Sequence, residues 1–175
     1  MREANVTGMV LVRSAVLADA ESIARIQVET WRAAYTGLMP EEVITSFDLE
    51  VQQRMWREGL GREPRPGGAV FVAELDDEVV GFASVGACRD EDGVAELYAI
   101  YVHPTCWDCG AGRALIQAAE ESMRGSGFHD AMLWVLEGNE RGERFYRAAG
   151  WAEDGKKDEE FQGAEVTELR YRKRL

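Results

Sequence analysis

The segment that most restricts the fold of this chain is "AELYAIYVHPTCWDCGAGRALIQAAEESMR", residues 95–124. Its first part is rich in β-branched and aromatic residues and predicts a strand, and residues 110–124 carry an apolar helical face. Gly110 and Gly112 stand where the helix begins. A helix start has free amide hydrogens and a positive dipole end, and glycines let a phosphate approach them closely. Arg113 could add a contact. A tight strand-to-helix connection would also explain the glycines, so the spacing alone leaves both interpretations open.

Hydrophobic periodicity and turn residues predict the other elements. Strands are expected at 9–14, 70–75, 78–88, 95–103 and 130–138, and twice within 151–175 around a turn at Gln162–Gly163. A turn at Asp76–Asp77 would join the second strand to the third. Further helices are expected at 19–35, 36–47, 48–60 and 139–150, with Asp19 and Asp48 as N-caps. This order indicates one mixed α/β domain over 1–175, with residues 1–8 as a flexible N-terminus.

The composition excludes several classes of function. With 20 basic and 32 acidic residues, the net charge is −12, which argues against nucleic acid as a partner. An acidic surface is compatible with a cationic acceptor and is also common for solubility alone. No apolar run is long enough to span a membrane, and the N-terminus lacks the layout of a signal peptide. Three cysteines fit reduced thiols, so a cytoplasmic location is expected.

A second segment, "GNERGERFYRAAGW", strengthens the phosphate interpretation. Asn139 and Tyr146 are seven residues apart in one predicted helix, which puts them on one face two turns apart. Together with "AELYAIYVHPTCWDCGAGRAL", this segment resembles the GNAT superfamily of acetyl-CoA-dependent N-acetyltransferases, and the resemblance extends over nearly the whole chain. The combination is far more specific than either segment alone.

The resemblance implies a fold and an activity. The fold would be a single domain with a mixed, mostly antiparallel sheet of about six to seven strands flanked by helices. Two splayed parallel strands would form the acyl-CoA cleft. Acetyl-CoA would be the acyl donor, a primary amine would attack it directly in a ternary complex, and no metal would be involved.

The resemblance also implies roles for single residues. Backbone groups of Ile100, Tyr101 and Val102 match the stretch that holds the pantetheine arm and the thioester. Asn139 matches a CoA-contacting position, and Tyr146 matches the residue that protonates the leaving thiolate. The positions that match the pyrophosphate loop are Asp108, Cys109, Gly110, Ala111, Gly112 and Arg113.

The proton acceptor and the acceptor pocket are less clear from the sequence. Glu96 matches a position of a base or water-holding glutamate, although it could be a surface glutamate of a strand. Some members carry this glutamate on the next strand, where this chain has Trp134. Aromatic residues beside a carboxylate suit an amine, and they also suit an ordinary core. The residues proposed for the acceptor are Trp31, Tyr35, Glu29 and Tyr98.

Three positions depart from the family pattern. Trp107 replaces the usual Gln or Arg, Asp108 replaces a glycine, and Cys109 replaces an Arg or Lys. A carboxylate at Asp108 is electrostatically unfavourable beside a pyrophosphate. Arginines in the following helix could meet the 3′-phosphate of CoA or could form a solvated face with Glu140 and Glu143. These arginines are Arg141, Arg144 and Arg147.

Two other functions remain open at this level. The chain could bind acyl-CoA without catalysis, as a sensor or interaction module, although such a protein would not need Tyr146 and Glu96. His103, Cys106 and Cys109 could instead form a redox or metal site, but the chain lacks a matching fourth ligand. The acceptor, the acyl-chain length and the oligomeric state are not determined by the sequence, and a homodimer is possible.

Overall fold

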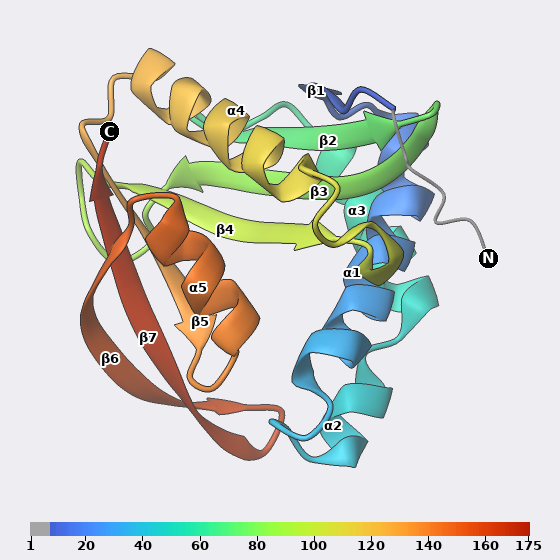
Figure 1. The fold of residues 1–175 in the computed structure, drawn as a ribbon, viewed down its shortest axis with the longest axis vertical. Helices are drawn as coiled ribbons and strands as arrows, with labels where there is room; N and C mark the ends of the chain where they lie inside the picture. The colour runs from blue at the N-terminus through green and yellow to red at the C-terminus, as the bar shows by residue number, and fades with distance from the viewer. Residues whose placement is uncertain (1–7) are drawn as a thin grey trace.

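The computed structural model describes residues 8–175, which form one seven-stranded sheet flanked by helices (Figure 1). The strands are β1 (Leu11–Ser14), β2 (Ala69–Leu75), β3 (Glu78–Ala87), β4 (Ala95–Val102), β5 (Asp130–Leu136), β6 (Ala152–Phe161) and β7 (Ala164–Arg174). They lie in the order β1-β2-β3-β4-β5-β7-β6, and only β4 and β5 pair in parallel. The predicted mixed, mostly antiparallel sheet is therefore confirmed. Of the predicted flexible segment 1–8, residues 1–7 lie outside the described residues.

Helices cover both faces of the sheet. Successive side chains of a strand point to opposite faces, so neighbouring residues pack against different helices. Ala73 and Ala83 pack with α4, whereas Val72 and Phe82 pack with α1 and α3. The helices are α1 (Ala20–Tyr35), α2 (Glu41–Ser46), α3 (Leu49–Leu60), α4 (Ala111–Gly125) and α5 (Glu140–Ala148), with short 3₁₀ turns η1 (Leu17–Asp19) and η2 (Pro104–Cys106). No helix among residues 8–175 is long and apolar enough to span a membrane.

The structure confirms one helix cap and two turns that were predicted from the sequence. The carboxylate of Asp48 accepts a hydrogen bond from the amide of Val51 at 2.9 Å and caps α3. Asp76 and Asp77 adopt positive φ values of 51° and 66° in the β2–β3 hairpin. Gln162 and Gly163 do the same between β6 and β7, with φ values of 49° and 84°. Tight two-residue hairpin loops require such left-handed backbones.

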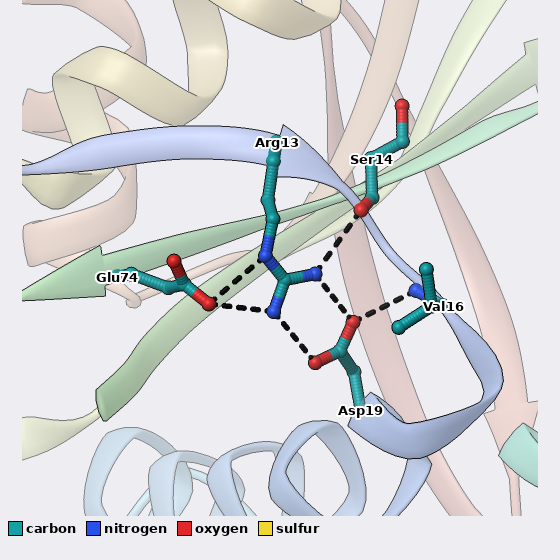
Figure 2. Close-up of polar contacts among 5 residues, drawn as sticks. All are labelled: Arg13, Ser14, Val16, Asp19 and Glu74. Carbon is teal, nitrogen blue, oxygen red and sulfur yellow. Dashed lines mark hydrogen bonds and ion pairs between the residues drawn. The ribbon is translucent and has the colours of Figure 1, made fainter. Parts of the chain in front are cut away.

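Asp19 has a different role from the predicted one. It immediately precedes α1, but its carboxylate makes no hydrogen bond to the start of that helix. It instead accepts two hydrogen bonds from Arg13, at 2.7 and 2.9 Å, and one from the amide of Val16 at 2.7 Å (Figure 2). Arg13 also donates to Glu74 at 2.6 and 2.9 Å. The hydrogen bonds from Arg13 lower the pKa of Asp19 despite its burial, and the cluster fixes α1 against β1 and β2.

The sheet opens between its two parallel strands. β4 and β5 pair only at Ala95–Ala131 and Glu96–Met132. Beyond that point β4 continues beside β3 up to Val102, while β5 pairs along its full length with β7. The two strands therefore diverge, and Figure 1 shows α5 lying over the gap between them. The predicted splay is thus confirmed.

Candidate functional site

A cleft of about 640 Å³ opens where β4 and β5 diverge, walled by β4, the loop after it, the start of α4, β5 and α5. Tyr146 and Tyr98 line this cleft. The cofactor-contact residues expected from the sequence that also line it are Ile100, Tyr101, Val102, Asp108, Gly110, Gly112, Arg113 and Asn139. The side chains of Cys109 and Ala111 do not line it, and Ala111 is fully buried in the core.

The edge of β4 in the cleft is unoccupied by protein. Beyond Glu96, β4 has no partner on its β5 side among the described residues, so main-chain groups that point into the cleft are available to a ligand. The carbonyl of Val102 is an exception. It accepts hydrogen bonds from Thr30 Oγ1 at 3.1 Å and from Trp107 Nε1 at 2.8 Å. These two bonds fasten the end of β4 to α1 and to the following loop.

The start of α4 contributes free amide groups to the same cleft. Gly110 precedes the helix with φ +92°, a conformation that favours glycine. The first hydrogen bond of the helix runs from the amide of Ala114 to the carbonyl of Gly110, at 3.1 Å. The amides of residues 111–113 therefore have no partner within the helix. A Cβ at Gly112 would lie 3.2 Å from the ring of Phe145, so this glycine lets α4 approach α5 closely.

The unusual loop residues take a definite arrangement. Asp108 adopts φ +72°, the region that glycine prefers, which explains why the family pattern has glycine there. Its carboxylate lies 3.3 Å from Arg141, whose guanidinium sits 4.3 Å from the centre of the Trp107 ring. Arg141 therefore offsets the negative charge at the mouth of the cleft. The other two arginines of α5 pair with glutamates of their own helix, Arg144 with Glu140 and Arg147 with Glu143.

The two loop cysteines form a close pair of free thiols, with their Sγ atoms 2.8 Å apart. Burial, and then the hydrogen bond with Cys109, raises the pKa of Cys106 to about 12. His103 is not directed at them, because its ring contacts Glu29 and Thr105. Within residues 8–175, no group of three or more His, Cys, Asp or Glu side chains is placed to hold a metal ion.

Three tyrosines gather at the inner end of the cleft: Tyr35, Tyr101 and Tyr146. Burial raises the pKa of each hydroxyl. The neighbouring Tyr35 further raises the pKa of Tyr146 and that of Tyr101. All three hydroxyl groups are therefore protonated at neutral pH and can donate hydrogen bonds.

Asn139 and Tyr146 line the same cleft, as their predicted common face implies, but Asn139 precedes α5 rather than lying within it, so the predicted start of the helix was wrong by one residue. The helix begins at Glu140, and the side-chain oxygen of Asn139 caps it by accepting from the amide of Gly142 at 3.0 Å. Sequence periodicity missed this because asparagine is also a preferred N-cap. Asn139 also lines the cleft, and its side chain partly counteracts the rise that burial causes in the pKa of Tyr35.

A second cavity, of about 410 Å³, adjoins the cleft and is here called the polar pocket. The two share Tyr35, Leu97, Tyr98, Tyr101 and Trp134 as a common wall. The remaining residues that line the polar pocket are Trp31, Met39, Arg89, Asp90, Glu96, Leu136, Lys157, Glu159, Phe161, Val166 and Glu168.

The residues expected to bind the acceptor divide between this pocket and other places. Trp31, Tyr35 and Tyr98 line the polar pocket. Glu29 does not; it pairs with His103 on another side of α1. The charged members from β6 and β7 were missed. Lys157, Glu159 and Phe161 alternate along β6, and this alternation could have indicated a common face.

Glu96 lies in the polar pocket rather than in the cleft, and its side chain is only 2% exposed. Arg89 donates to it from Nη2 at 2.5 Å, from Nε at 3.2 Å and from the main-chain amide at 3.2 Å. The carboxylate is therefore a buried group held in place by Arg89. It is located at the closed end of the splay, opposite Met132 of β5.

Comparison with known proteins agrees with this geometry. Residues 21–151 match the family model described as "Acetyltransferase (GNAT) family". The chain belongs to the GNAT acetyltransferase family. An uncharacterized N-acetyltransferase, YuaI of Bacillus subtilis, is 37% identical to this GNAT protein over 136 residues, which cover 75% of this chain and 74% of YuaI.

Two more distant relatives extend the comparison. A spermidine N(1)-acetyltransferase of Thermoplasma acidophilum is 24% identical over 130 residues, covering 73% of this chain and 79% of the relative. The crystal structure of the PaiA N-acetyltransferase of the same organism, in complex with coenzyme A, has a TM-score of 0.71 at 22% identity. It covers 95% of this chain and 99% of PaiA, so this GNAT chain shares the fold over nearly its whole length.

Proposed function

We propose that this protein transfers an acetyl group from acetyl-CoA to a primary amine, by direct attack in a ternary complex. The observation that carries the proposal is that one cleft combines an unpaired strand edge on β4 with the free amides at the start of α4. A ligand with a peptide-like arm and a pyrophosphate satisfies both. Membership of the GNAT family supports the activity, and the relatives that bind coenzyme A or act on spermidine support the two substrates.

The acyl donor would be held largely by backbone groups. Main-chain groups between Ile100 and Val102 would pair with the amide-containing pantetheine arm as an added strand does. The amides of residues 111–113 would hold the pyrophosphate, favoured by the helix dipole. Because Arg141 offsets Asp108, the carboxylate at the cleft mouth is not an obstacle to an anionic ligand.

Tyr146 would act on the leaving group. Its raised pKa keeps the hydroxyl protonated, so that it can donate a hydrogen bond and then a proton to the CoA sulfur. A thiol ordinarily loses its proton near pH ~8.5, below the phenol, but the same burial disfavours a thiolate anion in this cleft. Proton transfer from Tyr146 is therefore most favourable as the sulfur begins to carry charge.

The amine would enter from the polar pocket and lose its proton there. An alkylammonium with a pKa of ~10 must be deprotonated before it can attack a thioester. Glu96 would accept that proton through water. It stands four residues before Ile100, about 13 Å along an extended strand, so direct contact with the amine at the thioester is not expected.

Two measurements test the proposal. Acetyl-CoA should raise the melting temperature, because a ligand that binds only the folded state stabilises it. An unchanged melting temperature at millimolar acetyl-CoA would contradict the proposed cleft. Release of free CoA thiol should depend on added primary amine; binding of acetyl-CoA without any such release would favour a non-catalytic acyl-CoA-binding module.

A further inference from the structure

Two cysteines stand at the ends of a tight turn in the loop that leads from β4 to α4. The amide of Cys109 donates a hydrogen bond to the carbonyl of Cys106 at 3.2 Å, which closes the turn. Trp107 has φ −59° and ψ 137°, and Asp108 has φ 72°, the backbone of a type II β-turn. The first and last Cα atoms of such a turn lie within about 7 Å, a separation that overlaps the range a disulfide requires.

The side chains of this pair also face each other, but they differ in their access to solvent. Cys106 Sγ donates a hydrogen bond to Cys109 Sγ at 2.8 Å. Cys106 is 8% exposed, whereas Cys109 is half-buried. Because the pKa of Cys106 is raised to about 12, mainly by burial, this thiol keeps its proton at neutral pH. The sulfur that a small reagent can reach first is therefore that of Cys109.

We propose that Cys106 and Cys109 are a modification site, at which a low-molecular-weight disulfide such as oxidised glutathione converts the two thiols into a reversible disulfide bond. Cys109 Sγ attacks the small disulfide and releases one small thiol, which leaves a mixed disulfide on Cys109. Cys106 Sγ then attacks the Cys109 sulfur and releases the second small thiol. The two protein thiols lose two electrons and two protons, and these reduce the small disulfide to two thiols.

The new bond would stiffen the loop that carries the free amides of α4. A type II turn favours glycine at the position of Asp108, and aspartate adopts this positive φ less readily. A bond between the two ends of the turn restricts the other conformations open to Asp108. Because Gly110 and α4 follow directly, the oxidised protein should present a pre-formed pyrophosphate site and bind acetyl-CoA several-fold more tightly. The disulfide is independent of the proposed acetyl transfer, whereas this change in affinity rests on the proposed acetyl-CoA site.

The test equilibrates the protein in mixtures of reduced and oxidised glutathione, traps the remaining thiols with N-ethylmaleimide and counts them by mass spectrometry. We expect two of the three thiols to be lost together as the mixture becomes more oxidising. Cys88→Ser is the matched control, because Cys88 contacts Met132 rather than the pair, and it should leave this transition unchanged. Cys109→Ser should abolish the transition, and Cys106→Ser should stop it at a mixed disulfide of Cys109 with glutathione.

Calorimetry with acetyl-CoA then compares the fully reduced protein with the fully oxidised protein. If the oxidised protein binds more tightly, linkage requires that acetyl-CoA favour the disulfide by the same factor in a fixed glutathione mixture. Asp108→Gly should diminish the difference in affinity between the two states, because glycine adopts a positive φ readily.

The inference is overturned if no two-thiol transition occurs at any glutathione ratio, or if the transition includes Cys88. Equal affinity of the two states for acetyl-CoA would overturn the stiffening of the loop. A disulfide in a protein that binds acetyl-CoA in neither state would support the modification site and contradict the proposed function.

Discussion

The cleft and the polar pocket lie on either side of the same tyrosine-lined wall, yet they are built in different ways. Apart from three residues of α1, the cleft is lined by two short stretches, 97–113 and 134–146, and it offers the free backbone groups of β4 and of the start of α4. The polar pocket uses side chains from α1, β4, β5, β6 and β7, and ion pairs hold several of them. A site made of backbone depends on the fold, whereas a site made of side chains can change with single substitutions. The cleft should therefore determine the acyl donor and the polar pocket the acceptor.

The largest effect should come from the cleft side of the wall. Tyr146→Phe removes the proposed proton donor without changing the ring, and a positioned acid contributes roughly 10²–10⁴-fold to a rate. We expect kcat to fall by at least about 100-fold, while the affinities for acetyl-CoA and amine stay the same. Steady-state thiol release and calorimetry measure the two quantities. An unchanged rate would remove Tyr146 from the chemistry.

In the polar pocket, Glu96→Gln should change only the kinetic parameters for the amine. We expect kcat/KM for the amine to fall about tenfold, with no change in acetyl-CoA affinity. This is less than the roughly 10²–10⁴-fold effect of a directly positioned base, because Glu96 would act through water. The pH profile separates a base from a structural residue. Loss of the acidic limb of kcat/KM indicates proton transfer, whereas an unshifted profile with lower stability would show that Glu96 only holds Arg89.

Gly110→Ala should show the reverse selectivity. A Cβ meets no atom within 4 Å at Gly110, but φ +92° is unfavourable for alanine by roughly 1–2 kcal/mol. We expect acetyl-CoA affinity to fall several-fold and amine affinity to be unaffected. Gly59→Ala in α3 is the control, since that position also has open space but no positive φ. It should leave both affinities unchanged and slightly raise the melting temperature.

The smallest effect concerns the three tyrosines at the inner end of the cleft, and it appears only at alkaline pH. The pKa values of Tyr35, Tyr101 and Tyr146 are raised in the folded state. Below pH ~10 these groups are protonated in both states, so they do not change stability. Above pH ~10 the tyrosines of the unfolded chain lose their protons before those of the folded chain. The free energy of unfolding then falls by at most about 1.4 kcal/mol per pH unit for each tyrosine.

Thermal unfolding between pH 9 and 11 measures this decline. Tyr146→Phe should make the decline shallower, because one of the titrating groups is gone. If the wild type and this variant lose stability in parallel over that range, Tyr146 is not held in the buried, protonated state that the cleft requires.

The sequence predicted the cleft far better than the pocket, for a physical reason. Gly110, Gly112 and Tyr146 lie within two local segments. The helix start indicated the glycines, and the family resemblance indicated Tyr146. Trp31 and Lys157 are distant in sequence, and only the sheet order β5-β7-β6 and the position of α1 bring them to one cavity. The register of β6 against β7, which pairs Lys157 with Glu168, cannot be read from composition. Asn139 shows a smaller limit, because the sequence did not distinguish a cap from a first helical residue.

The most direct test of acetyl transfer measures both products in one reaction. Acetyl-CoA and a panel of primary amines are incubated with the protein, free CoA thiol is titrated, and each amine is analysed by mass spectrometry. We predict equal amounts of free thiol and of singly acetylated amine, with both almost absent for Tyr146→Phe. Thiol release without acetylated amine, or no release from a protein that binds acetyl-CoA, would contradict the account.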